Sequence, residues 1–208
     1  MFAIVDYDTG NTLNLKKALN YENINNQLTA DPNNILSADA IILPGVGAFK
    51  AAMDALQQRN LVEVIQKAAE KKIPILGICL GMQLLFDDSE EYGLNSGLSL
   101  IPGHIKSIPT TSGLKVPQMG WNQNQLQQPT SDFRSVDQQY TYFVHSYYAD
   151  CDAKYIVSSA DYGVQVPSIV QNQNVVGMQF HPEKSGQVGL NLLKKFQEMV
   201  KKNDFSRN

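Results

Sequence analysis

A cysteine between two glycines, at the end of an apolar run, is the most chemically suggestive feature of the sequence. Residues 73–78 have the composition of a buried strand, and Cys79 follows directly, flanked by Gly77 and Gly81. A Gly-x-Cys-x-Gly sequence between a strand and a helix is the thiol counterpart of the nucleophile elbow, whose sharp turn presents a side chain above the sheet. The helix expected after Cys79 would point its N-terminus at the sulfur and favour the thiolate. The pattern predicts a nucleophilic thiol, against the alternative of a small buried cysteine.

A thiol nucleophile needs a general base, and His181 is the leading candidate among the three histidines. It follows the strand-like run Val175–Phe180, and Pro182 keeps it extended. Glu183 comes two residues later, where its carboxylate can reach the imidazole. Because the carboxyl ends of parallel strands meet at one edge of a sheet, His181 and Cys79 can converge there. The alternative is a turn histidine with a local hydrogen bond.

The other histidines and the second cysteine fit structural roles better. His104 follows a Pro-Gly pair in a loop, and His145 lies near the end of an aromatic-rich strand, where a supporting role is expected. Cys151 stands between Asp150 and Asp152, whose carboxylates disfavour a thiolate. Neither cysteine is paired with another cysteine or a histidine at ligand spacing, so no metal site is expected.

Attack on a carbonyl also requires hydrogen-bond donors for the oxyanion. The N–H of Leu80, just past the expected elbow, is one candidate. The Pro-Gly-Val-Gly turn at 44–47 supplies others, because the backbone of Gly45, Val46 and Gly47 can approach a ligand closely. The turn is not a phosphate-binding loop, since no Gly-Lys-Ser/Thr follows it. A glycine-rich turn after a strand is otherwise an ordinary turn, so its functional reading depends on the thiol.

The elements that position these residues indicate one α/β domain spanning 1–208. Apolar runs alternate with helical patterns in the first half, which predicts a mostly parallel central sheet flanked by helices. The strands and helices expected there are 2–6, 13–21, 26–29, 40–43, 48–58, 61–72 and 73–78. From 87 to 168 short alternating runs replace the helical periodicity and predict an added antiparallel portion. The glutamine-rich stretch 123–128 is expected to be a surface loop, and a last helix to start at Ser185 or Gly186.

Composition excludes several classes of function. Of the residues, 43% are hydrophobic and 18% charged, as in globular proteins, and the net charge of −3 offers no footprint for nucleic acid. No apolar run approaches the ~20 residues of a membrane span, so no membrane association is expected. The start of the chain reads as a strand rather than a signal peptide. With two cysteines only, these observations predict a cytoplasmic location.

Three separated motifs resemble, in order, the class I or triad-type glutamine amidotransferases. They are Pro44–Gly47, Gly77–Gln83 and Phe180–Glu183, and the match extends over nearly the whole chain. The resemblance implies the fold of that class, L-glutamine as substrate, no cofactor, and a catalytic triad of Cys79, His181 and Glu183. It further implies that the glutamine is held by side chains and backbone at Gln83, Glu91, Ser146 and Tyr147. For Glu91, a solvated loop acid is the alternative.

Further segments resemble one subgroup of that class, the glutaminase subunits of imidazole glycerol phosphate synthase. The segments are 5–7, 10–11, 119–122, 142–147 and 181–185. This resemblance implies a heterodimer with a (β/α)₈-barrel cyclase subunit, to which ammonia passes in histidine biosynthesis. The positions that match partner-facing ones are Asn11, Trp121, Tyr142 and Lys184. For the two aromatic residues, ordinary core packing is the alternative.

The chain departs from the usual pattern of the subgroup at three positions. Asp8 stands where glycine is usual, Asn14 where serine is frequent, and Gln118 where histidine is typical. All three lie in segments that face the partner in the subgroup, so they bear on partner identity rather than on the reaction. The alternatives are a glutaminase that feeds a different acceptor synthase, a stand-alone hydrolase on the same fold, and a non-catalytic regulatory subunit.

Overall fold

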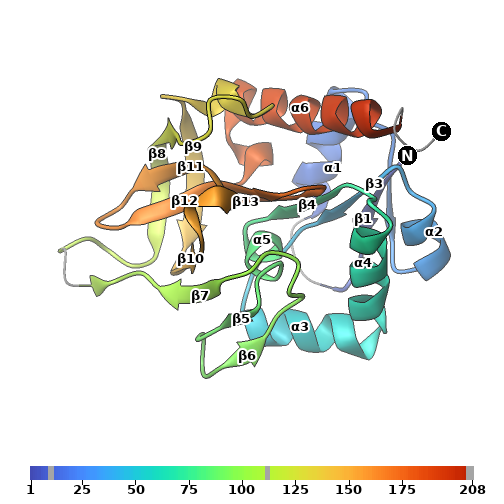
Figure 1. Ribbon diagram of the computed structural model, residues 1–208, viewed down its shortest axis with the longest axis horizontal. Coiled ribbons are helices and arrows are strands. Elements are labelled where there is room, and N and C mark those ends of the chain that lie inside the picture. The colour runs from blue at the N-terminus through green and yellow to red at the C-terminus, as the bar shows by residue number, and fades with distance from the viewer. Residues whose placement is uncertain (9–11, 111–112, 205–208) are drawn as a thin grey trace.

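A nine-stranded sheet forms the centre of the computed structural model, which describes residues 1–8, 12–110 and 113–204 (Figure 1). The strand order is β2-β1-β3-β4-β13-β12-β11-β8-β9. In that order the strands are Asn26–Thr29, Phe2–Val5, Ala40–Leu43, Ile75–Ile78, Val175–Met178, Gln165–Asn172, Ile156–Asp161, Gln118–Leu126 and Tyr140–His145. Neighbours from β2 to β13 pair in parallel, and those from β13 to β9 pair antiparallel. The predicted parallel sheet with an antiparallel portion is therefore confirmed, and β13 belongs to both parts.

Helices cover both faces of the parallel half of this sheet (Figure 1). The helices are α1 (Thr12–Tyr21), α2 (Pro32–Leu36), α3 (Phe49–Gln58), α4 (Leu61–Glu70), α5 (Leu80–Gln83) and α6 (Gly186–Asp204). Successive side chains of a strand point to opposite faces. In β1, Phe2 and Ile4 join the apolar cluster of α1 and α6, whereas Ala3 and Val5 join that of α3 and α4. Two cores result, and the sheet edge between them carries the ends of β3, β4 and β13.

A second, four-stranded sheet in the order β10-β7-β5-β6 lies beside the main one (Figure 1). Its strands are Tyr147–Asp150, His104–Ser107, Asp88–Ser89 and Asn95–Ser96. Only Ser146 separates β9 of the main sheet from β10 of the second, so the chain crosses between sheets at that residue. Sequence analysis did not separate this sheet from the antiparallel portion, because strands of two to four residues show no reliable periodicity.

One sequence expectation was wrong. The glutamine-rich stretch 123–128 is largely strand, since β8 extends to Leu126; Asn124 is buried while Gln123 and Gln125 are exposed. The inward positions of β8 also carry amide side chains, at Gln118, Asn122 and Asn124, so the polar–apolar alternation that marks a strand is absent. The helix expected after Cys79 is present as a single turn, α5, so the dipole at the sulfur is that of a few peptide groups.

Candidate active site

Cys79 lies in a strained turn between β4 and α5. Its φ of +55° and ψ of −111° form a conformation that residues other than glycine rarely adopt. The two flanking glycines let the neighbouring backbone pass. A Cβ on Gly81 would lie 1.8 Å from the carbonyl oxygen of Leu43, and a Cβ on Gly77 would lie 2.6 Å from that of Gly81. The elbow expected from the Gly-x-Cys-x-Gly pattern is present. Close contact with β3 explains Gly81, and close contact with the backbone of α5 explains Gly77.

Backbone and side-chain contacts hold His181 three residues beyond the end of β13. Its N–H donates to the carbonyl of Tyr142 on β9 at 3.0 Å, and its own carbonyl accepts from Oγ of Ser185 at 2.7 Å. Its Nδ1 lies 2.7 Å from Oε1 of Glu183, and both side chains are buried. This bond places a proton on Nδ1 and fixes the plane of the ring. The other ring nitrogen, Nε2, is buried and makes no hydrogen bond of standard geometry among the described residues.

The charge of His181 follows from its neighbours. Burial lowers the pKa of the imidazole, but hydrogen bonds and charges from Cys79 and Glu183 outweigh burial and raise the pKa from 6.5 to about 9. The ring is therefore protonated at neutral pH. Because Cys79 contributes to this shift, the thiol and the imidazole are neighbours, as the shared sheet edge predicts. A cation beside the sulfur is the environment of reactive cysteines.

Cys79 and His181 open onto a pocket of about 400 Å³. The other lining residues come from both sheets and the turn after β3: Val46, Gly47, Leu80, Gln83, Glu91, Pro117, Val144, His145, Ser146, Tyr147 and Lys184. The pocket thus collects all of the residues predicted for oxyanion and glutamine contacts except Gly45. A cavity of about 480 Å³ between α3, α4 and β6 is larger, but no cysteine or histidine lines it. The chemistry identifies the smaller pocket as the candidate site.

The carbonyl oxygen of Tyr147 links the elbow to the second sheet. Nε2 of Gln83 donates to it at 2.9 Å and contacts Oε1 of Gln179 at 3.1 Å. Nδ1 of His145 lies 2.7 Å from the same Tyr147 oxygen and donates to it. Burial, assisted by the charge of His181, lowers the pKa of His145 to about 4 against the opposing effect of this hydrogen bond, so the ring is neutral. The amide nitrogen of Gln83 is engaged by the protein, and its oxygen remains for a ligand.

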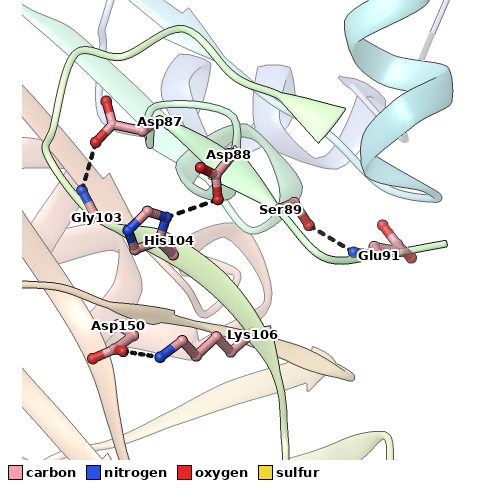
Figure 2. Close-up of polar contacts among 8 residues, drawn as sticks. All are labelled: Asp87, Asp88, Ser89, Glu91, Gly103, His104, Lys106 and Asp150. Carbon is pink, nitrogen blue, oxygen red and sulfur yellow. Dashed lines mark hydrogen bonds and ion pairs between the residues drawn. The ribbon is translucent and has the colours of Figure 1, made fainter. Parts of the chain in front are cut away.

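Glu91 follows β5 and reaches the start of α3. Its Oε2 accepts from the N–H of Phe49 at 2.6 Å and so caps the start of α3. The N-cap residue of that helix, Ala48, has no side chain that could do this. Its own N–H donates to Oγ of Ser89 at 3.2 Å (Figure 2). Glu91 is half-buried and lines the pocket, so it is not a freely solvated loop acid. One carboxylate oxygen is bound to the helix start, which directly follows the Pro-Gly-Val-Gly turn.

Exposed ion pairs stabilise the second sheet that carries Glu91 (Figure 2). Nδ1 of His104 lies 2.8 Å from Oδ1 of Asp88, its register partner on β5, and this hydrogen bond raises the pKa of the exposed imidazole. Lys106 on β7 pairs with Asp150 on β10. His104 thus joins β5 to β7 and takes no part in the pocket.

Tyr7 packs against the turn after β3 and stabilises it by a hydrogen bond. The buried Tyr7 hydroxyl donates to the carbonyl of Pro44, and a Cβ on Gly45 would lie 2.7 Å from that hydroxyl oxygen. Gly45 lines only a small space of about 20 Å³ beside His181 and Glu183. Val46 and Gly47 line the main pocket, and Gly47 has a φ of +99°. Close packing therefore explains Gly45, while the next two residues face the site.

Three residues predicted to face a partner lie at the mouth of the pocket, on or beside β8 and β9. The rings of Trp121 and Tyr142 pack edge to face with centroids 6.1 Å apart, and Nζ of Lys184 lies 5.9 Å from the centroid of Tyr142. Trp121 is 53% exposed, so it is not a core aromatic residue. The fourth residue, Asn11, lies outside the described residues.

The three departures from the subgroup pattern lie in different environments. Asp8 is exposed, pairs with Arg59 and has a φ of +60°, which explains why glycine is usual there. Asn14 on α1 is half-buried. Gln118 is fully buried directly opposite His145, so its side chain does not face a partner as expected from its segment. The difference at position 118 therefore affects the interior next to the site and not the partner-facing surface.

Sequence analysis missed part of the pocket wall and of the exposed face. Sγ of Cys79 lies 3.8 Å from the carbonyl oxygen of Val144 on β9, and Pro117 lines the pocket just before β8. Met119 on β8 and Tyr140 on β9 are 64% and 54% exposed and lie on the same face of the sheet as Trp121 and Tyr142. Strand alternation along β8 and β9 would have indicated these positions, had β8 been recognised as a strand.

The described residues contain no group of three or more histidine, cysteine, aspartate or glutamate side chains that could hold a metal ion. Among the described helices, none is both long and apolar enough to cross a bilayer.

Comparisons with known proteins agree with this site. The family model for class-I glutamine amidotransferases matches residues 3–199. A solved glutamine amidotransferase superposes with a TM-score of 0.75 at 15% identity, covering 95% of this chain and 98% of its own. PurLQS from Thermotoga maritima gives 0.73 at 19% identity, covering 96% and 98%. These two likenesses show the fold.

Sequence relatives are much more similar. The imidazole glycerol phosphate synthase subunit HisH of Lactiplantibacillus plantarum is 64% identical over 208 residues, all of both chains. The HisH subunit of a Listeria monocytogenes strain is 47% identical over 200 residues, 96% of each chain. The chain therefore belongs to the class I glutamine amidotransferases and, among them, to the HisH subunits of imidazole glycerol phosphate synthase.

Proposed function

We propose that residues 1–208 act as a single glutaminase domain that hydrolyses L-glutamine to glutamate and ammonia with Cys79, His181 and Glu183. The observation that carries the proposal is the buried His181 ring, bonded to Glu183 and raised in pKa to about 9 by Glu183 and Cys79 beside a 400 Å³ pocket. A protonated imidazole between a thiol and a carboxylate is the arrangement that nucleophilic cysteine catalysis requires.

His181 holds the proton of Cys79 as an imidazolium, and in the first step the thiolate sulfur forms a bond to the side-chain carbonyl carbon of glutamine. The carbonyl oxygen becomes an oxyanion, for which the N–H of Leu80 and a backbone N–H of Val46 or Gly47 are the proposed donors. Glu183 stabilises this imidazolium.

In the second step the carbon–nitrogen bond breaks, and the proton of His181 passes to the leaving nitrogen, which departs as ammonia. Water then attacks the glutamyl thioester with His181 as the base, the carbon–sulfur bond breaks, and the Cys79 thiol is restored with release of glutamate. The thioester divides one difficult hydrolysis into two easier steps. The α-carboxylate and α-ammonium groups of glutamine are assigned to the backbone of Ser146 and Tyr147 and to the side-chain oxygens of Gln83 and Glu91.

Ammonia released into water is protonated and lost, so this reaction is useful when the subunit is docked on an acceptor enzyme. We infer a (β/α)₈-barrel cyclase subunit as that partner, in a heterodimer of histidine biosynthesis. The exposed Trp121 and Lys184, with the half-buried Tyr142 between them, support a docking surface there, because aromatic and cationic side chains are favoured interface anchors.

Glutamate release from glutamine tests this proposal, measured with the purified chain alone and with a barrel cyclase plus its nucleotide ligand. We expect little release by the chain alone and a large rise with the cyclase. Equal release in both cases would contradict the partner assignment and favour a stand-alone hydrolase. Absence of release in both cases, together with a Cys79 that does not react with a glutamine-analogue electrophile, would contradict the catalytic assignment.

A further inference from the structure

The side-chain amide of Gln83, which lines the pocket, has both of its N–H groups engaged by the protein. Its Nε2 donates to the carbonyl oxygen of Tyr147 at 2.9 Å and to Oε1 of Gln179 at 3.1 Å. An amide nitrogen carries two hydrogens, and an amide oxygen can only accept. Turning the Gln83 amide by 180° would therefore bring its oxygen against the carbonyl oxygen of Tyr147. The orientation is fixed, and the oxygen of Gln83 is the atom left for a ligand.

Gln179 supplies the second acceptor for this amide from inside the protein. Its side chain is completely buried, directly after β13 and two residues before His181. Its backbone N–H donates to the carbonyl of Ser168 on β12 at 2.9 Å, which fixes the segment from which the amide extends. Its Nε2 is also inaccessible to solvent and has no hydrogen-bond partner among the described residues. Within that part of the chain, the bond to Gln83 is the one hydrogen bond of the Gln179 side chain.

An amide at this position is an unfavourable choice for the core if stability is its sole purpose. A buried donor without an acceptor is costly, and most such groups in folded proteins are paired. Turning the Gln179 amide does not remove the cost, because it would place two N–H₂ groups against each other. Methionine would fill a similar space without burying a donor. The amide oxygen is the part of Gln179 that has a use, and that use is to hold the second N–H of Gln83.

We propose that Gln179 is a positioning residue of the glutaminase site: its amide oxygen fixes the Gln83 amide, so that the oxygen of Gln83 accepts from the α-ammonium group of glutamine. Tyr147 holds this amide from the second sheet, and Gln179 holds it from the end of β13. With one N–H released, the amide can swing about its bond to Tyr147, and its oxygen is no longer fixed. The proposal rests on the proposed function, because it requires glutamine as the ligand.

The proposal predicts an effect that depends on one group of the ligand. Glutaramate is glutamine without the α-ammonium group, so it cannot donate to the oxygen of Gln83. Gln179→Met keeps the approximate size of the side chain and removes the acceptor. We expect it to weaken the binding of glutamine about fivefold, the order of one hydrogen bond, and to leave the binding of glutaramate unchanged. A general loosening of the pocket would weaken both ligands equally.

Ligand-observed NMR titration measures both dissociation constants on the complex with the barrel cyclase and its nucleotide ligand, in a Cys79→Ala background without turnover. Gln179→Glu should bind glutamine as the parent does, because a carboxyl group has the same shape and still offers an oxygen to Gln83. Gln171→Met is the matched control on β12, since the Gln171 amide donates to the carbonyl of Gln173 outside the pocket. An equal effect of Gln179→Met on both ligands, or no effect on either, would overturn the proposal.

The hydrogen bond itself is observed by NMR on the ¹⁵N-labelled full chain without a ligand. Both side-chain N–H resonances of Gln83 are expected in the hydrogen-bonded range in the parent chain and in Gln179→Glu. In Gln179→Met one of them should move to the position of an unbonded amide, while the other, bonded to Tyr147, stays. Two unmoved resonances would overturn the proposal. This readout needs no glutamine, so a chain that fails to bind or hydrolyse glutamine would refute the proposed function and leave this inference separately decided.

Discussion

The parallel half of the main sheet and the antiparallel wing with the second sheet contribute to the same pocket by different means. In the parallel half, close backbone packing positions the nucleophile and the turn after β3: Gly81 lies against β3, Gly45 against Tyr7, and Cys79 occupies a strained turn. In the wing and second sheet, side-chain hydrogen bonds do so, at Tyr147 through Gln83 and His145 and at Glu91 through α3.

This difference teaches how the two regions tolerate change. A steric fit between backbone segments accepts almost no added atom, because a Cβ at 1.8 Å from a carbonyl oxygen requires the backbone to move. A hydrogen-bonded support can be replaced by another group with the same donor. Substitutions in the parallel half should therefore affect kcat, and those in the second region should affect KM or partner affinity.

The largest effect is expected from Cys79→Ala. Glutamine-dependent turnover should fall more than about a thousandfold, because the covalent route is lost, while synthesis by the complex from added ammonium remains. The other cysteine provides the control: burial, together with Asp150 and Asp152, raises the pKa of Cys151 to about 11, so Cys151→Ala should be fully active. Full glutaminase activity in Cys79→Ala would show that the elbow is not the reactive centre.

Glu183→Gln should lower kcat by about 100-fold or more, because the His181 ring loses the group that fixes its tautomer and stabilises its charge. NMR titration should find the pKa of His181 well below its value of about 9 in the parent chain. Glu198→Gln on α6, which removes the ion pair with Lys195 and not one at the pocket, serves as a control. A variant with normal kcat would mean that Cys79 alone suffices to hold the imidazolium.

The raised pKa of His181 predicts how the stability of the fold depends on pH. A group whose pKa is raised on folding stabilises the protein fully below its unfolded value and loses that contribution as pH rises through its folded value. For His181 the window extends from 6.5 to about 9. Urea unfolding across that range should show falling stability in the parent chain and a flatter profile in Glu183→Gln.

Glu91→Gln tests the second region. We expect the KM for glutamine to rise about thirtyfold, through loss of a charged partner for the α-ammonium group and of a charged cap on α3, with kcat little changed. The neighbouring Glu90, whose Oε1 accepts from the N–H of Ser107 on β7, offers Glu90→Gln as a matched control. If kcat fell instead of KM rising, Glu91 would belong with the backbone-held chemistry, and the division between regions would fail.

The smallest effect is expected from Trp121→Ala, which should weaken binding to the cyclase about tenfold and leave the pKa of His181 unchanged. Calorimetric titration measures the affinity, and Tyr21→Ala, an exposed aromatic on α1, is the control. Equal loss in both variants would show that the mouth of the pocket is not the docking surface.

The sequence alone predicted those features whose geometry is determined by residues close together in the chain. The elbow at Cys79 follows from Gly-x-Cys-x-Gly, the pairing of His181 with Glu183 from a two-residue spacing, and the parallel half from alternating apolar runs and helical patterns. These features depend on the short-range reach of backbone and side chains, so the sequence itself predicts them.

Tertiary structure alone decided the rest, because the relevant partners are distant in the chain. Nothing near Gln83 in sequence indicates that Tyr147 accepts from its amide, and nothing near Glu91 indicates that it caps α3 at Phe49. Gln118 looked like a surface departure until burial placed it opposite His145. Whether a polar side chain binds substrate, supports the site or faces water depends on burial and on long-range contacts, which only the packed fold determines.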